Sequence, residues 1–477
     1  MQRQLKSTRG SRTKLNSVDF ELSDVQRKRY DEIVAAAGER FVRPTDERFA
    51  SPSDERFASP TDEQFASPTD EQFVRPTGQH LTRADWRTAA DLGLTGLCLP
   101  IEYGGLGLGA LDTALCLEAF GRGCADTGLV FAVAAHLLAC AVPIRDFAAE
   151  PVRGELLSAL AGGGVIASNA MTEDDAGSDV GALAATARRQ GDQYIVDGVK
   201  SFASNAPVAD LFVTYAVTEP KAGFLGVTAF AVPADRPGTD RPGTNRPGTN
   251  RSGTNRSDAD QPDADQPGTN RPGTGRPGAN RPGTDRPGID VSEPLAKMGL
   301  HGCPAGRVRF VGCAVPAEFR IGAEGQGSAV FQHSMNWERA CLPAIYVGVM
   351  AEQLRRCVAH AGQRRQFGRR IGDNQAISHL LATMAQRLAS ARLLLYRACW
   401  LLDQDEPEHR ATAAMAKIAV SEAAVANGLD AIQVFGGAGY LTATGIEAGL
   451  RDAVPSTIFS GTTQIQREIV VRELGLG

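Results

Sequence analysis

The sequence predicts an α+β multidomain protein with a helical N-terminal domain, a central antiparallel β domain and a C-terminal helical bundle. Apolar residues recur at helical spacing over 18–40 and 80–165. Short β-favouring runs such as YIVDGVK and VTAFAV follow up to residue 321, and long amphipathic segments return from Gly325. Because helices never alternate singly with strands, a doubly wound nucleotide-binding fold is disfavoured.

The N-terminal helical domain is expected over residues 18–165. The turn-forming stretch Pro100–Gly109 interrupts it, but its glycines do not form GxGxxG between a strand and a helix. The longest apolar run, Leu129–Val142, is shorter than the roughly 17 to 25 residues that cross a bilayer, so we expect a buried helix and no membrane partner. Residues 1–17 are basic and predict a disordered tail, with a transit peptide as the alternative.

The central β domain is expected over 166–321 and the C-terminal bundle over 322–477, where Ala376–Leu402 and Ala411–Val434 have helical spacing. Tandem repeats interrupt the first two domains. An octapeptide such as DERFASPT fills 46–77, and pentapeptides such as RPGTN fill 236–290. Since Pro and Gly suit turns and few apolar side chains are available to bury, we predict that the pentapeptides form a solvated loop.

Composition favours small-molecule chemistry. With 42% hydrophobic residues and a net charge of −5, the chain offers no extensive basic surface for nucleic acid. Its nine cysteines show no CxxC spacing, so we expect no disulfide framework, no metal site and a reducing cytoplasm. His301 and Cys303 lie close together without a second ligand pair and are interpreted as loop residues.

Five stretches occur in a characteristic order. They are MTEDDAGSDV from Met171, GVKSFASNAPVAD, RRQFG followed by Gln375, QVFGGAGY, and RDAVPSTIFSGTTQIQREIV. In this order they resemble the signature of the acyl-CoA dehydrogenase family from about residue 80 to the end, apart from the pentapeptides.

The resemblance implies a C-terminal four-helix bundle, bound FAD and a homotetramer or homodimer. It implies flavin contacts within one subunit from Met171, Thr172, Ser178, Phe202 and Ser204, with Thr462 and Gln464 closing the site. It implies that a neighbouring subunit contributes Arg364, Gln366, Phe367, Gln433 and Gly437, and that Gln375 also binds the cofactor. Family members often have Trp and Thr where this chain has Phe202 and Ser204, and both replacements keep an aromatic wall and a hydroxyl donor.

The catalytic base is expected on a helix. Removal of the α proton of an acyl thioester needs a carboxylate, and in many family members a Glu precedes the GT of the last motif, where this chain has Ser460. Isovaleryl and long-chain enzymes instead place the Glu before an Arg in the bundle, which matches Glu338 and Arg339. Helical spacing also puts Glu338 on one apolar face with Cys341, Leu342, Ile345 and Val349, and burial there would raise its pKa. An ion pair with an Arg of the bundle is the alternative.

The expected reaction is FAD-dependent α,β-dehydrogenation of an acyl thioester, carried by CoA or by an acyl-carrier protein. The backbone N–H of Ser460 would polarise the thioester carbonyl, and Ser178, Arg339 and Gly461 would contact the substrate. An electron-transfer flavoprotein or oxygen would accept the electrons. The alternatives are a flavin oxidase or monooxygenase on the same fold and a catalytically silent flavoprotein scaffold.

Overall fold

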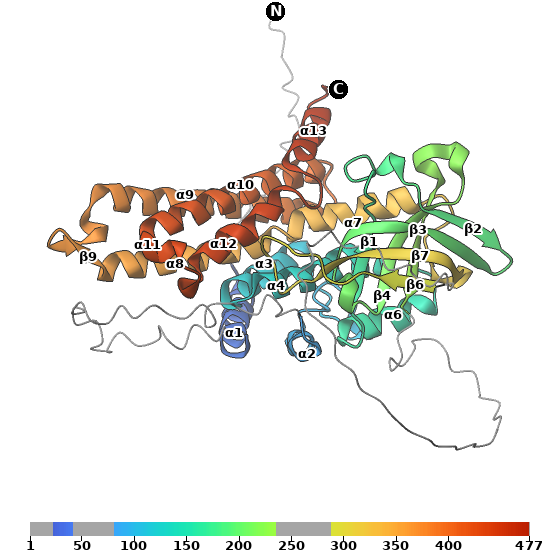
Figure 1. The fold of residues 1–477 in the computed structure, drawn as a ribbon, viewed down its shortest axis with the longest axis horizontal. Helices are drawn as coiled ribbons and strands as arrows, with labels where there is room; N and C mark the ends of the chain where they lie inside the picture. Colours follow the sequence, from blue (N-terminus) through green and yellow to red (C-terminus); the bar gives the residue numbers. More distant parts are fainter. Residues whose placement is uncertain (1–21, 42–80, 235–287, 477) are drawn as a thin grey trace, which may run out of the picture.

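The computed structural model describes residues 22–41, 81–234 and 288–476. The long C-terminal helices occupy one half of the molecule and a twisted sheet the other, with α6 (Val152–Ala161) on the sheet side and α7 (Gly327–Cys341) between the two halves (Figure 1). The basic tail, the octapeptides and residues 236–287 of the pentapeptide repeats lie outside the described residues. The predicted fold class is confirmed.

The N-terminal helices begin at recognisable caps. Ser23 and Thr82 each form a capping box. The cap hydroxyl accepts a hydrogen bond from the backbone N–H of the third helical residue, and the side chain of that residue accepts one from the backbone N–H of the cap. The helices of this part are α1 (Asp24–Arg40), α2 (Arg83–Asp91), α3 (Ala110–Gly123), α4 (Thr127–Ala135), α5 (Val142–Phe147) and α6 (Val152–Ala161).

The predicted buried helix around Leu129–Val142 is present. A π-helical turn, His136–Ala141, joins α4 to α5 into one helical stretch. Within the described residues, two helical stretches are long and apolar enough to span a membrane: Thr127–Phe147, whose most apolar window is 94% buried, and His409–Phe435, 44% buried. The first is a core element of the protein, since it packs between the sheet and the bundle.

The central sheet has the strand order β6-β7-β3-β2-β4-β5-β8, with β1 added beside β4. Most pairs are antiparallel, as predicted, but β1 runs parallel to β4 and β2 meets β4 in parallel at one residue pair. The strands are β1 (Ala167–Ala170), β2 (Thr186–Gln190), β3 (Gln193–Ser204), β4 (Leu211–Val217), β5 (Val227–Pro233), β6 (Gly288–Val291), β7 (Ala305–Pro316) and β8 (Arg320–Ile321).

The end of the pentapeptide segment departs from its prediction. Gly288, Ile289 and Asp290 belong to β6 and pair with β7. Ile289 replaces the usual repeat threonine and packs partly buried against the inner cluster of the sheet, which explains why a strand forms there.

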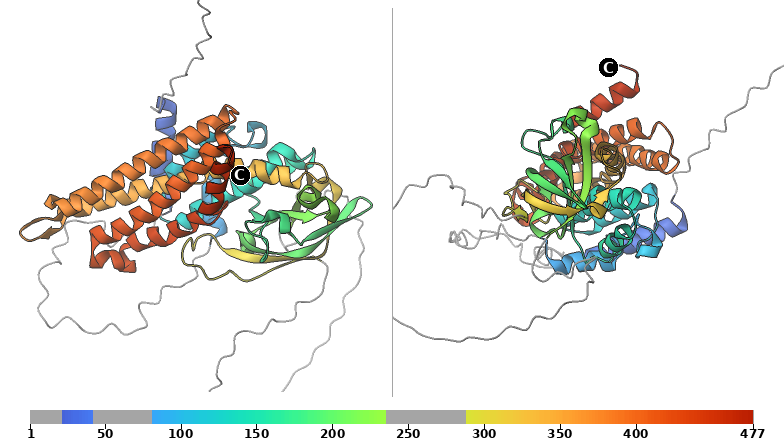
Figure 2. Two further views of the ribbon diagram at one scale, coloured as in Figure 1. Left: turned by 90° about the horizontal axis from the view of Figure 1, so that it is seen from above. Right: turned by 90° about the vertical axis from the view of Figure 1, so that its right-hand side faces the viewer.

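The C-terminal helices form the bundle, seen from above in Figure 2. Its two longest members, α9 and α10, contain the two segments for which helical spacing was predicted. The elements are α7 (Gly327–Cys341), α8 (Ala344–Gln363), the hairpin β9 (Arg365–Gln366) and β10 (Arg369–Arg370), α9 (Gln375–Asp403), α10 (His409–Phe435), α11 (Gly437–Tyr440), α12 (Ile446–Ala453) and α13 (Thr463–Glu473).

One predicted helical face is interrupted. Residues 338–349 were expected on a single helix, but α7 ends at Cys341 and α8 begins at Ala344. Pro343 lies between them, and a proline cannot donate the backbone hydrogen bond that a continuous helix needs. Glu338 therefore shares a helix with Cys341, whereas Ile345 and Val349 lie on the next one.

Candidate active site

Glu338 lies on α7, facing the interior. Its side chain is buried, with the residue 8% exposed, and desolvation raises the pKa of its carboxyl group above the ordinary value. The Ser460 hydroxyl, which donates to Glu338 Oε1, and the charges of Arg339 and Lys417 oppose that rise. Among the described residues Oε2 has no hydrogen-bond partner. The predicted alternative, an ion pair with an Arg of the bundle, is not formed by Glu338 within the described residues.

The Ser460–Gly461 turn places the Ser460 hydroxyl against the Glu338 carboxylate. Both residues have positive φ, 54° and 89°, and such a conformation at a non-glycine residue is uncommon and costs energy. Side chains from three helices hold the turn. Arg339 Nε donates to the Ser460 carbonyl at 3.2 Å, and Lys417 Nζ donates to the Gly461 carbonyl at 2.6 Å. Gln466 Nε2 donates to both carbonyls, at 3.0 and 2.9 Å.

The structure thus brings together four residues predicted from the sequence: Glu338, Arg339, Ser460 and Gly461. Thr462, also predicted, follows directly as the N-cap of α13, where its hydroxyl accepts the Ile465 N–H, whereas Gln464 is exposed on that helix. No acceptor among the described residues takes the backbone N–H of Ser460, which leaves this donor for a ligand oxygen.

Two residues of this cluster were missed: Lys417 and Gln466. Both are buried. A lysine in the alanine-rich run AAMAKIAV was the available signal, because a charged side chain on an apolar helix is seldom buried without a role. Gln466 had no comparable signal, since its neighbours in α13 include many polar residues, among them Gln464, Arg467 and Glu468.

Predicted flavin residues of the same chain meet at the start of the β domain. The Ser201 N–H donates to the Thr172 carbonyl at 2.7 Å, which joins the loop after β1 to β3. Beneath them the ammonium of Lys200, fully buried, pairs with Glu173 at 2.7 Å and donates to the Met171 carbonyl. Glu173 in turn accepts the backbone N–H groups of residues 184 and 185.

The residues of this loop and strand fit a flavin. Phe202 has a φ of 58° and is 62% exposed, so a large aromatic ring is held outward on strained backbone. Such a ring gives a flat cofactor an apolar wall, and the hydroxyls of Ser178, exposed, and Ser204, half-buried, lie on the same two segments. FAD supplies a two-electron acceptor for hydride when it is bound there.

The other predicted flavin residues lie at the far end of the bundle. Arg364, Gln366 and Phe367 are at the β9–β10 hairpin, which projects away from the sheet (Figure 1). Gln375 begins α9, Gln433 is in the last turn of α10, and Gly437 begins α11. All six are exposed, and Phe367 is 97% exposed. This chain therefore does not bring them to its own Glu338.

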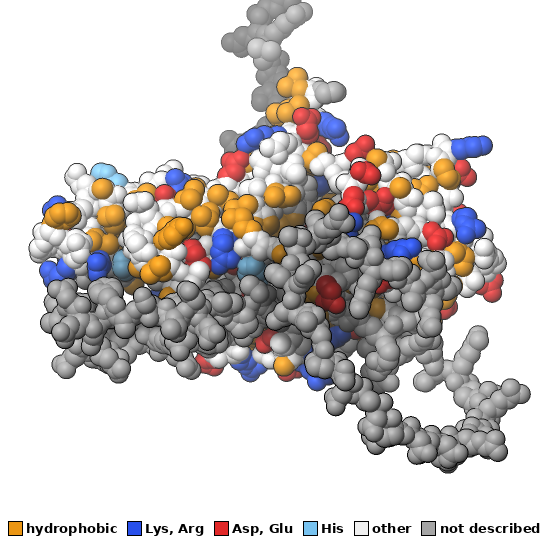
Figure 3. Space-filling view, viewed as in Figure 1, with side chains coloured by type: hydrophobic (Ala, Val, Ile, Leu, Met, Phe, Trp, Pro, Cys, Tyr) orange, Lys and Arg blue, Asp and Glu red, His pale blue; other side chains and the backbone are white. Residues whose placement is uncertain are grey.

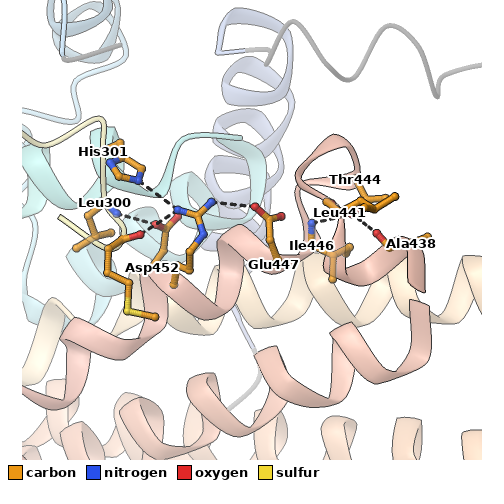
Figure 4. Close-up of polar contacts among 10 residues, drawn as sticks. Leu300, His301, Ala438, Leu441, Thr444, Ile446, Glu447 and Asp452 are labelled. Carbon is orange, nitrogen blue, oxygen red and sulfur yellow. Dashed lines mark hydrogen bonds and ion pairs between the residues drawn. The ribbon is translucent and has the colours of Figure 1, made fainter. Parts of the chain in front are cut away.

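His301 serves as a structural contact. Figure 4 shows the loop around Leu300 and His301 against α12, where His301 Nε2 lies 3.2 Å from an Arg451 nitrogen. The Leu300 N–H donates to Asp452 at 2.6 Å, and Arg451 also bonds Glu447. No group of three or more metal-ligating side chains occurs among the described residues.

The fold and the buried carboxylate of Glu338 indicate a class of enzyme, the flavoprotein dehydrogenases that act on acyl thioesters. The chain belongs to the acyl-CoA dehydrogenase family: models of the N-terminal, middle and C-terminal domains of acyl-CoA dehydrogenases match residues 56–164, 168–258 and 325–475. It is thus an FAD-dependent oxidoreductase that removes hydrogen from adjacent carbons of an acyl thioester.

Particular relatives narrow this class. The chain is 48% identical over 398 residues to an L-prolyl-[peptidyl-carrier protein] dehydrogenase of Pseudomonas fluorescens, covering 83% of this chain and 91% of the relative. It is 40% identical to an enzyme of the same name from Serratia sp., covering 82% and 88%. The solved structure of PigA with FAD and proline is 36% identical, with a TM-score of 0.77 and coverage of 96% and 99%. The prolyl acyl carrier protein oxidase AnaB is 31% identical, with a TM-score of 0.76 and coverage of 96% and 100%.

Proposed function

We propose that this enzyme dehydrogenates a prolyl group held as a thioester on a peptidyl-carrier protein. Two relatives that are named for this activity align over more than four fifths of the chain. Acyl-CoA is the competing carrier, because CoA and a carrier protein's phosphopantetheine arm present the same thioester. The substrate preference of the purified enzyme decides between them.

Glu338 is the proposed base. Its buried Oε2, which has no hydrogen-bond partner among the described residues, is the observation that carries this assignment, since an unpaired carboxylate oxygen on a group with a raised pKa suits proton abstraction near neutrality. In the reaction the α C–H bond breaks, the proton goes to Oε2, and the C–H electrons form the α,β double bond. The hydride leaving the β carbon carries away the second electron pair.

The Ser460 turn is the proposed electrophilic side of the site. Its free backbone N–H would donate to the thioester carbonyl oxygen, where negative charge gathers as the α proton leaves. Gly461 offers no side chain to block this approach, and the charge of Arg339 beside the base favours its ionised form. Ser178 is the proposed contact for the rest of the substrate.

We infer that flavin is bound between subunits. Met171, Thr172, Ser178, Phe202 and Ser204, with Thr462 and Gln464, would hold it from one chain, and the six residues at the distal end of the bundle from its neighbour. Self-association is supported by large apolar side chains exposed on the bundle, including Phe367, Tyr440 and Leu441. Figure 3, which has the view of Figure 1, shows hydrophobic side chains gathered over the helical half of the molecule. The family pattern indicates a homotetramer.

The electron acceptor and the compartment are further parts of the proposal. An electron-transfer flavoprotein is the expected acceptor, and oxygen is the second candidate because one relative, AnaB, is named an oxidase. A cytoplasmic location is supported by the cysteines, since all nine lie buried in the protein without the spacing of a disulfide framework.

Anaerobic mixing with thioesters tests the function. The holoenzyme and its Glu338→Gln variant would each be mixed with L-prolyl-carrier protein, acyl-carrier proteins and acyl-CoAs while flavin absorbance is followed. We expect prolyl-carrier protein to bleach the parent flavin and the variant to react at least about a hundred-fold more slowly. Equal bleaching would place the base elsewhere, faster bleaching by acyl-CoA would overturn the carrier assignment, and a parent that no thioester bleaches would overturn the function.

A further inference from the structure

Lys417 is a buried cation next to the proposed base that the proposed chemistry does not use. It lies on α10 among small apolar side chains, and its ammonium is 2.6 Å from the Gly461 carbonyl and 5.9 Å from the centre of the Phe459 ring. A buried ammonium is costly to desolvate, so its place beneath the turn calls for an explanation beyond packing.

We propose that Lys417 is a positioning residue of the reaction: its ammonium holds the Ser460–Gly461 turn so that the Ser460 hydroxyl stays on Glu338 Oε1 and Oε2 remains the atom that takes the proton. This inference rests on the proposed role of Glu338.

The geometry supports this role because the turn has to be held. Positive φ at Ser460 is unfavourable for a residue with a Cβ, so the turn persists only where surrounding bonds outweigh that cost. Arg339 bonds one carbonyl of the turn and Gln466 bonds both, but Lys417 makes the shortest of these bonds, to Gly461. It also brings a full charge, and hydrogen bonds from charged donors are about twice as strong as neutral ones.

The charges around Glu338 support the same role. Arg339 from α7 and Lys417 from α10 both favour the ionised carboxylate. From the π-helical turn and from β4, Cys140 and Tyr215 also lie within electrostatic range of Glu338, and burial raises the pKa of both groups, so they stay neutral. Burial and the charge of Arg339 lower the pKa of Lys417 to about 8, although Glu338 opposes this. Lys417 is therefore charged at neutral pH.

Removal of the ammonium should act on Glu338 in two ways. Without its charge the pKa of Glu338 rises further, and without its bond the turn can release the Ser460 hydroxyl from Oε1. A role in packing alone would lower stability without moving the titration of Glu338.

The experiment compares holoenzymes carrying Lys417→Met, Lys417→Gln and Lys417→Arg with a matched control, Lys297→Met. Lys297 is a partly buried lysine that, like Lys417, donates to a backbone carbonyl, that of Cys303 at 2.8 Å, and the charged groups near it do not include Glu338. Infrared titration of substrate-free enzyme, with the band assigned by Glu338→Gln, reports the protonation of Glu338. Stopped-flow mixing with prolyl-carrier protein reports the rate of flavin reduction and the Kd of the thioester.

In Lys417→Met we expect the Glu338 titration to move to higher pH. We also expect the reduction rate to fall about ten-fold to a hundred-fold while Kd changes far less, as for a misplaced catalytic group. Lys417→Arg should recover most of the rate, and Lys417→Gln, which keeps a donor without charge, should lie between them. Lys297→Met should behave as the parent.

An unmoved Glu338 titration in Lys417→Met would overturn the role of Lys417, as would an equal effect in Lys297→Met. If Lys417→Met does not fold with FAD, the Lys417→Gln variant takes its place, with the same infrared titration and the same stopped-flow measurement. The infrared reading needs no turnover, so the failures are distinguishable: a parent that thioesters do not reduce refutes the proposed function, whereas an unmoved titration refutes the role of Lys417.

Discussion

The Ser460 hydroxyl donates a hydrogen bond to the Glu338 carboxylate although 122 residues separate the two in sequence. The family resemblance implies a Glu at the position of Ser460 in many members, whereas here that position supplies a hydroxyl that bonds a carboxylate on α7. Ser460 thereby joins two proposed functions, a side chain that orients the base and a backbone N–H that faces the substrate.

Ser460→Ala should shift the pH dependence of flavin reduction. The bond from Ser460 lowers the pKa of Glu338 against the larger effect of burial, so its loss raises that pKa further. Because the base must be ionised, activity is lost as pH falls through this pKa, and the acid limb of the rate profile moves to higher pH. Stopped-flow rates between pH 5 and 9 measure the shift.

Ser421→Ala is the control for that variant. Ser421, on α10, is a buried serine whose hydroxyl likewise donates a hydrogen bond, to the Ser456 carbonyl at 3.0 Å. We expect an unchanged acid limb. A limb that stays in place in Ser460→Ala would show that the hydroxyl does not act on the base.

Glu338→Gln should make the protein more stable while it slows the reaction. A carboxyl whose pKa is raised by folding binds its proton more readily in the folded state. Ionised Glu338 therefore destabilises the folded protein once the pH rises above the pKa that this group has in the unfolded chain. The destabilisation reaches its full size above the pKa of the folded state. Gln carries no such cost. We expect a gain of roughly 0.5–2 kcal/mol at pH 8 and a smaller one at pH 5, measured by urea unfolding.

Glu118→Gln is the control, because it changes a buried glutamate in the same way but should have the opposite effect on stability. Glu118 is equally buried, but its oxygens bond Tyr30, Tyr396 and Arg392. Removal of its charge leaves the guanidinium of Arg392 without its partner, so this variant should lose stability. A loss of stability in both variants would indicate that Glu338 is structural.

Local pattern predicted the helices well and the contacts between them poorly. The spacing in α9 and α10 located both helices, because each buries one continuous face. The same reasoning wrongly extended the helical face of Glu338 past Pro343, where the helix is interrupted. It also gave no sign that β1 pairs in parallel with β4, since pairing direction depends on the path of the chain.

The sequence predicted several residues of the site but not the contacts between them. Family motifs indicated Glu338, Arg339 and Ser460, but the bond from the Ser460 hydroxyl depends on how α7 packs beside the last turn before α13. Lys417 was missed because spacing along α10 cannot tell which of its residues lies beneath that turn. Packing between distant segments decided these contacts.

Lys200→Met should cost both stability and FAD. Lys200 is fully buried and its loss leaves the Glu173 carboxylate without a countercharge, which costs about 3–5 kcal/mol for a buried pair. The pair also anchors the loop of Thr172 to the strand of Phe202, so FAD should be lost as well. Urea unfolding and the flavin-to-protein absorbance ratio measure the two effects.

Two comparisons check that explanation. The double variant Lys200→Met/Glu173→Gln should be less destabilised than Lys200→Met, because no buried charge is left unpaired. Arg153→Met removes an exposed pair with Glu150, which solvent screens, and should therefore destabilise the protein far less than Lys200→Met. Equal losses in the single and double variants would contradict the uncompensated charge as the cause.

Phe367→Ala should weaken FAD binding without destabilising the apoprotein chain. Its ring is 97% exposed at the tip of the β9–β10 hairpin, so it contributes little to the folding of its own chain. If a neighbouring subunit's flavin covers it, truncation removes that contact. Val25→Ala, which shortens another exposed apolar side chain, should leave FAD content unchanged.

Complementation distinguishes a contact between subunits from one within a chain. Phe202→Asp would disable the flavin wall of the chain that carries it, and Phe367→Ala the contribution from the distal end of the bundle. In a mixed pair whose flavin sites are shared between chains, one site carries both defects and the other carries neither, so co-expression restores part of the FAD content and activity. If both residues serve the flavin of their own chain, every site keeps one defect and co-expression restores nothing. Restoration therefore requires that Phe367 reach across the interface.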